Sequence, residues 1–167
     1  MLKPFFSVII PTYNQASFLK KAIESTLNQT YKNFEIIVID NNSKDGTASI
    51  LKEYKKKIIC KKINNKGVIA KSRNLGIKLA KGKWVAFLDS DDYWSKHKLH
   101  TIKKFIRNPL FDVICHSEWI LYLEEKKLSL WSYGPYKKNF YKLLLKHGNK
   151  FSTSASIVRK SFLDKTN

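Results

Sequence analysis

Acidic residues are scarce in this chain of 167 residues, with 13 Asp and Glu against 32 Lys and Arg and a formal charge of +19. Arginine is scarce as well, because only Arg73, Arg107 and Arg159 are present and the other 29 basic residues are lysines. Base-edge and bidentate phosphate contacts favour Arg over Lys, so this composition argues against nucleic acid as a partner. A lysine-rich surface suits either non-specific attraction to anionic surfaces such as lipid headgroups, or solvation without any partner.

Cysteines and long apolar runs are also few. Cys60 and Cys115 are single and far apart, a spacing that fits neither a metal site nor a disulfide framework, so we expect reduced structural thiols. No apolar run approaches the ~20 residues that span a bilayer. The N-terminal residues lead directly into a strand pattern without a separate signal-peptide core or cleavage site, which predicts a cytoplasmic protein.

Phosphate-binding glycine motifs are missing too: the sequence has no Gly-x-Gly-x-x-Gly after its first predicted strand and no Gly-Lys-Ser/Thr loop. What it does have is a regular alternation of patterns over the first 88 residues. Near-continuous apolar runs predict strands at 5–10, 34–39, 57–63 and 84–88. Helical spacing predicts helices at 17–29, from 47 onward, and at 68–81, with Asn14 or Ser17 capping the first. This alternation is typical of a parallel α/β sheet, and the lysines at 57–63 predict an edge strand.

The pattern changes after residue 92. We predict, in order, a helix at 96–107, a strand at 112–123, a hairpin tip at 124–127, an antiparallel return at 128–133, a helix at 138–147, a strand at 152–158, and a turn or helix from Ser161. One domain of this length has room for a substantial core.

The most unusual stretch is an acidic cluster formed by Asp89, Asp91 and Asp92, directly after the apolar segment 85–88. Crowded carboxylates repel one another unless protons or a cation neutralise them. Carboxylate oxygens are also the ligands that Mg²⁺ and Mn²⁺ prefer. Alternatively, Ser90, Asp91 or Asp92 caps a following helix, but a cap uses one side chain and leaves the others unexplained. The cluster therefore predicts a divalent metal site.

Polar groups follow two other predicted strands as well. Pro11-Thr12-Tyr13 comes after the first strand and Asp40 after the second. In an open parallel sheet, ligands bind outside the carboxyl ends of the strands. We therefore expect these groups and the acidic cluster to lie at one edge, facing one crevice.

Taken together, these segments closely resemble the family 2 glycosyltransferases with the GT-A fold. The matching segments are SVIIPTYN at 7–14, IVID at 37–40, DGT at 45–47, NKG at 65–67, SRN at 72–74 and FLDSDD at 87–92. The resemblance implies an α/β GT-A fold, that is, a Rossmann-like, mostly parallel sheet flanked by helices. Residues 1–95 would form the nucleotide-sugar-binding part, and 96–167 a smaller, mixed acceptor-side part of the same domain.

The resemblance also implies roles for single residues. Pro11, Thr12, Tyr13, Asp40, Arg73 and Asp89 would bind the nucleotide of the donor. Tyr13 offers a flat face on which a base can stack, although a loop aromatic that covers the core is the alternative. Asp40 can accept the imino hydrogen of uracil, which favours a UDP-sugar, although a strand-end or turn Asp is the alternative. Arg73 would reach the nucleotide, and a helix-surface cation is the alternative.

Asp89-Ser90-Asp91 resembles the family's metal-binding Asp-x-Asp motif. The resemblance makes Asp91 the direct ligand of Mg²⁺ or Mn²⁺, and places Asp89 near the ribose or in the water shell of the metal. Asp92 would contact the donor sugar. Asn41 departs from the family, which often has another Asp there.

The family inverts the anomeric carbon with a carboxylate base, which lies shortly after the region that matches 152–162. The chain ends at Asn167 before such a motif, and the context of Asp164 does not match it. We therefore expect an N-terminal portion, truncated before the base. For His116 and Glu118, which could also face the crevice, we expect structural or acceptor-side roles.

The leading hypothesis is a transferase that passes a sugar from a nucleotide-sugar to a saccharide or lipid-linked acceptor, in bacterial surface polysaccharide or lipid-linked glycan synthesis. The alternatives are a nucleotide-binding fragment without turnover and a basic nucleic-acid-binding domain. The lysines, with Trp119, Trp131 and Tyr133, add the hypothesis of a peripheral contact with an anionic membrane at the inner face of the cell.

Overall fold

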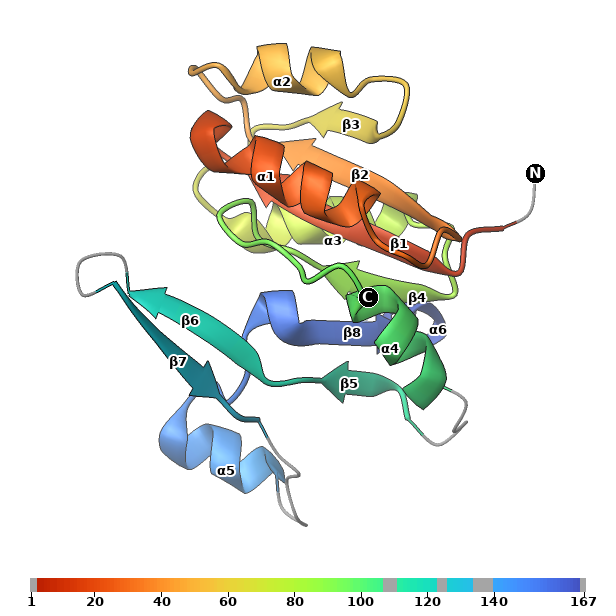
Figure 1. Cartoon of the computed structure of the whole chain (residues 1–167), viewed down its shortest axis with the longest axis vertical. Helices are drawn as coiled ribbons and strands as arrows, with labels where there is room; N and C mark the ends of the chain where they lie inside the picture. Colours follow the sequence, from red (N-terminus) through yellow and green to blue (C-terminus); the bar gives the residue numbers. More distant parts are fainter. Residues whose placement is uncertain (1–2, 107–110, 123–125, 134–139, 166–167) are drawn as a thin grey trace.

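A single six-stranded sheet forms the centre of the protein in the computed structural model, which describes residues 3–106, 111–122, 126–133 and 140–165 (Figure 1). The strand order is β3-β2-β1-β4-β8-β5. The strands are β1 (Phe6–Thr12), β2 (Phe34–Asp40), β3 (Ile59–Lys62), β4 (Trp84–Phe87), β5 (Val113–Cys115) and β8 (Ser156–Arg159). The first four strands are parallel, whereas β8 runs antiparallel to β4 and β5. This arrangement confirms the mostly parallel α/β sheet and the edge position of β3.

Helices cover both faces of the sheet. Neighbouring side chains of a strand point to opposite faces, so an apolar strand such as β1 has apolar side chains to bury on each face. The helices are α1 (Ala16–Leu27), α2 (Thr47–Glu53), α3 (Ile69–Leu79), α4 (Lys98–Phe105), α5 (Phe140–His147) and α6 (Lys160–Leu163). Val8 and Ile10 pack in the larger core with α1, α2 and α4, while Ile9 packs on the other face with α3. Figure 1 shows α1 in front of β1 and β2 and α3 behind them. None of the helices in the described ranges has the length and apolarity that crossing a membrane requires.

Strand β1 does not end before Pro11, as its sequence suggested, but continues to Thr12. Pro11 pairs with Ile39 of β2, while the pairing of β1 with β4 ends at Ile9. The nitrogen of Pro11 faces the β4 side, where β4 has already ended at Phe87. The missing N–H therefore removes no ladder hydrogen bond, which is the condition for proline within a sheet.

Helix α1 also begins differently from the prediction. Its N-cap is Gln15, and Asn14 has a positive φ of 50° rather than a capping conformation. The N–H of Ala16 instead donates to Asp45 Oδ2, at 2.9 Å, from the loop after β2. A free helix N–H is thus satisfied by a residue distant in the sequence, which local patterns do not reveal.

The second part of the chain is more divided than predicted. The expected strand at 112–123 is two strands, β5 in the large sheet and β6 (Glu118–Tyr122), which pairs with β7 (Lys127–Trp131) in a separate antiparallel hairpin. The hairpin confirms the antiparallel return, but residues 124 and 125 of the expected tip, and residue 123 of the expected strand, lie outside the described residues. The expected strand at 152–158 begins as the 3-10 turn η1 (Thr153–Ala155), and only β8 is extended. Helices α5 and α6 confirm the last two predicted helical segments over the residues described.

Gly76 of α3 supports a testable prediction about packing. A Cβ added there would lie 2.4 Å from Cγ2 of Ile9, which is fully buried in β1. We expect Gly76→Ala to lower the free energy of unfolding in urea by about 1–3 kcal/mol, because overpacking a buried contact forces neighbours apart. Gly46→Ala is the control, since a Cβ there would meet Ala16 Cβ at an ordinary 3.6 Å. Equal stability of the two variants would contradict the close approach.

Candidate functional site

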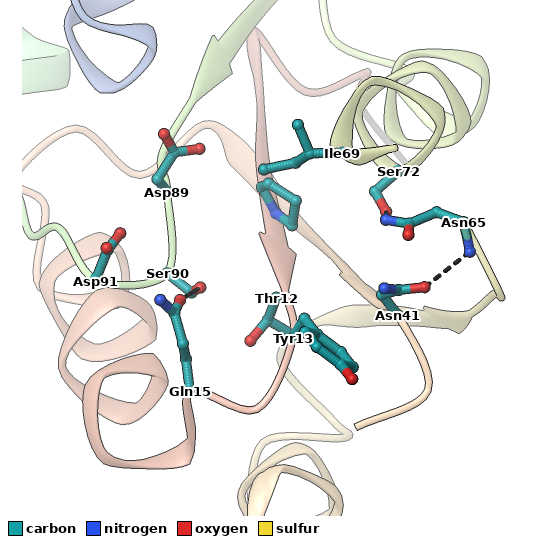
Figure 2. A pocket seen from close by; sticks show the side chains of 11 residues that line it. Thr12, Tyr13, Gln15, Asn41, Asn65, Ile69, Ser72, Asp89, Ser90 and Asp91 are labelled. Atoms are coloured by element: carbon teal, nitrogen blue, oxygen red, sulfur yellow. Dashed lines mark hydrogen bonds between the residues drawn. The ribbon is translucent and has the colours of Figure 1, made fainter. Parts of the chain in front are cut away.

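A pocket of about 240 Å³ lies where β1, β2 and β4 end (Figure 2). Thr12 of β1 pairs with Asp40 of β2, and the N–H of Leu88 donates to the carbonyl of Ile9, which keeps the chain after β4 beside β1. The residues that line the pocket are Pro11, Thr12, Tyr13, Gln15, Asn41, Asn65, Ile69, Ser72, Asp89, Ser90 and Asp91. Five of the residues singled out from the sequence are thus brought together: Pro11, Thr12, Tyr13, Asp89 and Asp91.

The pocket has two chemically different sides, with Thr12 and Tyr13 between them. Figure 2 shows Asp89, Ser90 and Asp91 on one side and the amide-bearing Asn41 and Asn65 on the other. Tyr13 is 56% exposed, so its ring is available for stacking. The Thr12 hydroxyl is buried and has no hydrogen-bond partner among the described residues. An unsatisfied buried hydroxyl costs about 1–3 kcal/mol, so a polar ligand atom at this position would be stabilising.

The amide side is built by hydrogen bonds that the sequence did not predict. Asn41 Oδ1 accepts from the backbone N–H of Asn65 at 2.7 Å, and Asn65 Nδ2 donates to the Ser72 hydroxyl at 3.0 Å (Figure 2). These bonds join the loop after β2 to the start of α3. The sequence signal was present in the Asn-Lys-Gly and Ser-Arg-Asn segments, but it identified neither Asn65 nor Ser72 as pocket residues.

Asp40 lies behind the pocket rather than on its surface, since it is only 4% exposed and is not one of the lining residues. Its Oδ1 accepts from both the N–H (3.0 Å) and the hydroxyl (2.5 Å) of Ser43. The Ser43 hydroxyl accepts in turn from the N–H of Asn14. Asp40 therefore ties the loops after β1 and β2 together, and its contact with a base stays a prediction.

The acidic cluster is not a helix cap. Helix α4 begins only at Lys98, and its N-cap is His97. The N–H of Asp92 donates to the carbonyl of Asp89 at 3.0 Å, so the cluster is a tight turn. Within it, Asp91 is exposed at the pocket.

Ser90 and Arg73 hold this turn from two directions. Ser90 is buried and donates to Gln15, which immediately precedes α1. Arg73 of α3 forms an ion pair with Asp89, with Nη2 2.7 Å from Oδ1. Arg73 Nε is buried without a partner in the described part of the chain. Arg73 is therefore not a free helix-surface cation, although it is not a lining residue of the pocket.

Asp92 faces a second, larger cavity, an open groove of about 1540 Å³ that shares Asp91 with the pocket. Side chains of α4, β5 and the β6–β7 hairpin line this groove. Burial raises the pKa of Asp92, a hydrogen bond with Ser154 opposes that rise, and the charges of Asp91, Asp89 and Glu118 add to it. Asp92 therefore lies where the two cavities meet.

Three further polar residues line the groove. Lys98 is 8% exposed, donates to the carbonyl of Ser154 at 2.6 Å and lies 4.0 Å from the centre of the Trp94 ring. Burial lowers the pKa of Lys98 well below its ordinary value, while the charges of Glu118 and Asp92 oppose this. Burial and the nearby charge of Lys98 lower the pKa of His116 to about 4. Glu118 accepts a hydrogen bond from the Tyr133 hydroxyl.

The carboxylates fit a metal that is shared with a ligand. Within the described ranges, no three His, Cys, Asp or Glu side chains converge into a cage that would hold an ion alone. Mg²⁺ in proteins commonly takes one or two carboxylates and completes its coordination with phosphate oxygens and water. An exposed Asp91 beside an anchored Asp89 meets that description.

Comparison with known proteins identifies relatives of the whole arrangement. The family model described as Glycosyl transferase family 2 matches residues 7–165. The chain is 47% identical, over 94 residues, to the Escherichia coli UDP-Glc:α-D-GlcNAc-diphosphoundecaprenol β-1,3-glucosyltransferase WfaP, a match that covers 56% of the chain and 38% of that protein.

Solved structures share the fold. Staphylococcus aureus TarS 1–349 in complex with UDP superposes with a TM-score of 0.73 at 26% identity, over 96% of this chain and 48% of that one. A mannosyltransferase from Pyrobaculum calidifontis, in complex with GDP-Man and Mn²⁺, has a TM-score of 0.71 at 20% identity, over 99% and 47%. The chain thus spans less than half the length of each of these three proteins.

The depressed pKa of His116 predicts a pH dependence of stability. Because its folded-state pKa of about 4 lies below the ordinary 6.5, the unfolded chain binds more protons between these pH values. The free energy of unfolding should therefore rise with pH across this window, by roughly 2–3 kcal/mol from this residue. Urea unfolding of His116→Asn should show a flatter dependence on pH than that of the wild-type protein. An unchanged slope in His116→Asn would contradict the assignment.

Proposed function

The chain belongs to glycosyl transferase family 2, and we propose that it transfers a sugar, with inversion, from a nucleotide-sugar donor to an acceptor hydroxyl. The observation that carries the proposal is the pocket in which Tyr13 and Thr12 lie opposite Asp89 and Asp91. One side suits a nucleoside and the other a diphosphate held by a divalent cation. The UDP bound to TarS, a relative by fold, supports UDP as the nucleotide.

The donor contacts follow from this orientation. Stacking on Tyr13 contributes about 1–3 kcal/mol in comparable sites, and the free Thr12 hydroxyl adds a polar contact. Pro11 lines the pocket beside them, and Asp40 accepts the uracil imino hydrogen when a uridine is bound. Arg73 and Asp89 bind the nucleotide as an ion-paired unit. Residues 1–95 are thus the donor-binding part.

Asp91 would hold Mg²⁺ or Mn²⁺ directly, and Asp89, fixed by Arg73, would contribute near the ribose or in the water shell of the ion. When bound, the metal neutralises the negative charge that builds on the departing nucleoside diphosphate. The Mn²⁺ in the mannosyltransferase of the same fold supports this choice of ion. Asp92, at the junction of pocket and groove, contacts the donor sugar.

The acceptor enters from the groove, which residues of the 96–167 part largely line. Its hydroxyl oxygen forms a bond to the anomeric carbon while the bond to the diphosphate oxygen breaks, and its proton passes to a carboxylate base. We assign that base to none of the described residues. The lipid-linked substrate in the name of the E. coli relative supports a saccharide or lipid-linked acceptor of bacterial surface glycan synthesis.

Binding without turnover is the second candidate. In the described lining of the groove, Glu118 is the one carboxylate outside the acidic cluster, and it already accepts a hydrogen bond from Tyr133. An engaged carboxylate is a poorer proton acceptor, so nothing in the described groove favours proton removal over simple binding. Release of the donor sugar, with or without acceptor, would separate the two candidates.

We also propose that a cytoplasmic, peripheral form of the protein contacts the anionic inner face of the membrane. Across the β6–β7 hairpin, Trp119 pairs with Leu130 and Leu121 with Leu128, so all four share one face. These side chains are between 47% and 66% exposed. An exposed apolar face on a chain of net charge +19 suits an interface with anionic lipid.

A thermal-shift titration tests donor binding. We expect UDP with Mn²⁺ to raise the melting temperature, and EDTA to remove most of that rise, because the diphosphate is held through the ion. Asp91→Ala should abolish the metal-dependent part, whereas Asp164→Ala, an exposed carboxylate of the C-terminal segment, should not. A UDP shift that survives in Asp91→Ala would contradict the metal assignment. Indifference to UDP and metal, with tight and salt-sensitive RNA or DNA binding, would support a nucleic-acid binder instead.

Vesicle sedimentation tests the membrane contact. We expect binding to phosphatidylglycerol vesicles at low salt and little binding to phosphatidylcholine, because the attraction is electrostatic. Replacing both Leu121 and Leu128 by Ser should weaken binding to the acidic vesicles by about tenfold or more, because apolar burial in the lipid interface is lost. Phe162→Ser, an exposed apolar residue of α6, is the control. Equal binding of the wild-type protein to both lipids would count against the proposal.

A further inference from the structure

Ser154, near the end of the chain, is hydrogen-bonded to three residues of the segment that carries the acidic cluster. Its hydroxyl accepts from the N–H of Asp89 at 2.9 Å. Its carbonyl accepts from Lys98 Nζ at 2.6 Å and from Trp94 Nε1 at 3.3 Å. Ser154 therefore contacts the acidic turn through its side chain and the following segment through its backbone.

The antiparallel strand β8 brings Ser154 to this position. Ile157 of β8 pairs with Ala86 of β4, so the η1 turn before β8 lies beyond the end of β4, where the acidic turn begins. The turn is itself fixed, because Ser152 Oγ accepts from the N–H of Ser154 and the Ser156 hydroxyl donates to the carbonyl of Ser152. Ser154 is only 5% exposed. A buried group thus holds the acidic turn in addition to Arg73 and Gln15.

From these contacts we infer that Ser154 is a positioning residue, which holds Asp89 so that the acidic turn presents its oxygens to the diphosphate of a bound nucleotide. The inference rests on the proposed donor-binding function. Three carboxylates within four positions repel one another, and a fixed hydrogen bond to the backbone of the turn opposes their separation.

Lys98 in turn holds Ser154 in place. Its buried Nζ group holds the carbonyl of Ser154 and lies over the Trp94 ring, so it fixes the orientation of the serine. Lys98 lines the groove and not the pocket, and in the described part of the chain its hydrogen bond toward the acidic turn is the one to Ser154. Desolvating a buried ammonium group is costly, and Met is a side chain of similar length without a charge. Lys98→Met therefore removes the hydrogen bond to Ser154 without leaving a buried charge unpaired.

The experiment compares two ligands that differ only in the part that the acidic turn contacts. Affinity is measured for UDP with Mn²⁺ by calorimetry, and for uridine without metal by NMR titration. We expect Ser154→Ala to weaken the binding of UDP with Mn²⁺ by about tenfold and that of uridine by less than about twofold. Ser154→Thr keeps the hydroxyl and should recover most of the UDP affinity. Thr26→Val, which removes a fully buried hydroxyl of α1 that donates to the carbonyl of Ala22, should leave both affinities unchanged.

Lys98→Met tests whether UDP affinity can fall without a loss of stability, which separates a positioning effect from misfolding. We expect it to keep or raise the melting temperature and yet to weaken the binding of UDP with Mn²⁺. Equal weakening of both ligands by Ser154→Ala, or an unaffected UDP affinity, would overturn the positioning role. Failure of the wild-type chain to bind UDP would instead contradict the proposed function, so the two failures are distinguishable.

Discussion

The pairing of β1 between β2 and β4 is the constraint on which the rest of the structure depends. Parallel strands that share a register end at one edge of a sheet, so the residues after them must meet there. Thr12 and Asp40 end their strands as a pair, and Leu88 continues the same ladder toward Asp89. Pro11 is compatible with this pairing despite its missing N–H, because its nitrogen faces the side on which β4 has ended. Strand pairing thus determines where the pocket lies and which residues can line it.

Concentrated negative charge is the second constraint, in a chain that is otherwise strongly basic. The protein does not place its abundant lysines against the exposed Asp91 in the described contacts. It uses Arg73 as an ion-pair partner of Asp89, and neutral hydroxyl groups of Ser90 and Ser154 to fix the turn. Much of the potential of the three carboxylates is therefore not offset by basic side chains in the described contacts. Under the proposed function, this potential would attract the cation that accompanies the diphosphate.

Much of the fold and part of the site followed from the sequence, because both depend on short-range patterns. Apolar runs identified the parallel strands, and the segments Pro-Thr-Tyr and Asp-Ser-Asp identified residues that do line one pocket. Asp40 was found by the same reasoning, but its carboxylate is buried against Ser43, since strand position does not say which face of a loop is open. The prediction of a single strand at 112–123 was wrong, because β propensity does not reveal which strand a segment pairs with. Its first half pairs with β8, and its second half forms a hairpin with β7.

The sequence by itself determined the chemistry of the strand ends: an aromatic and a hydroxyl after β1, and crowded carboxylates after β4. Local patterns suffice there because strand, turn and motif are contiguous. Only the tertiary structure decided how those groups are held. Asp45 satisfies the start of α1, Asn41 fixes the loop before α3, and Ser154 reaches Asp89 across 65 positions of the chain. The physical reason is that β8 enters the sheet antiparallel beside β4, and such a long-range pairing is set by the packing of the whole domain rather than by any neighbouring residue.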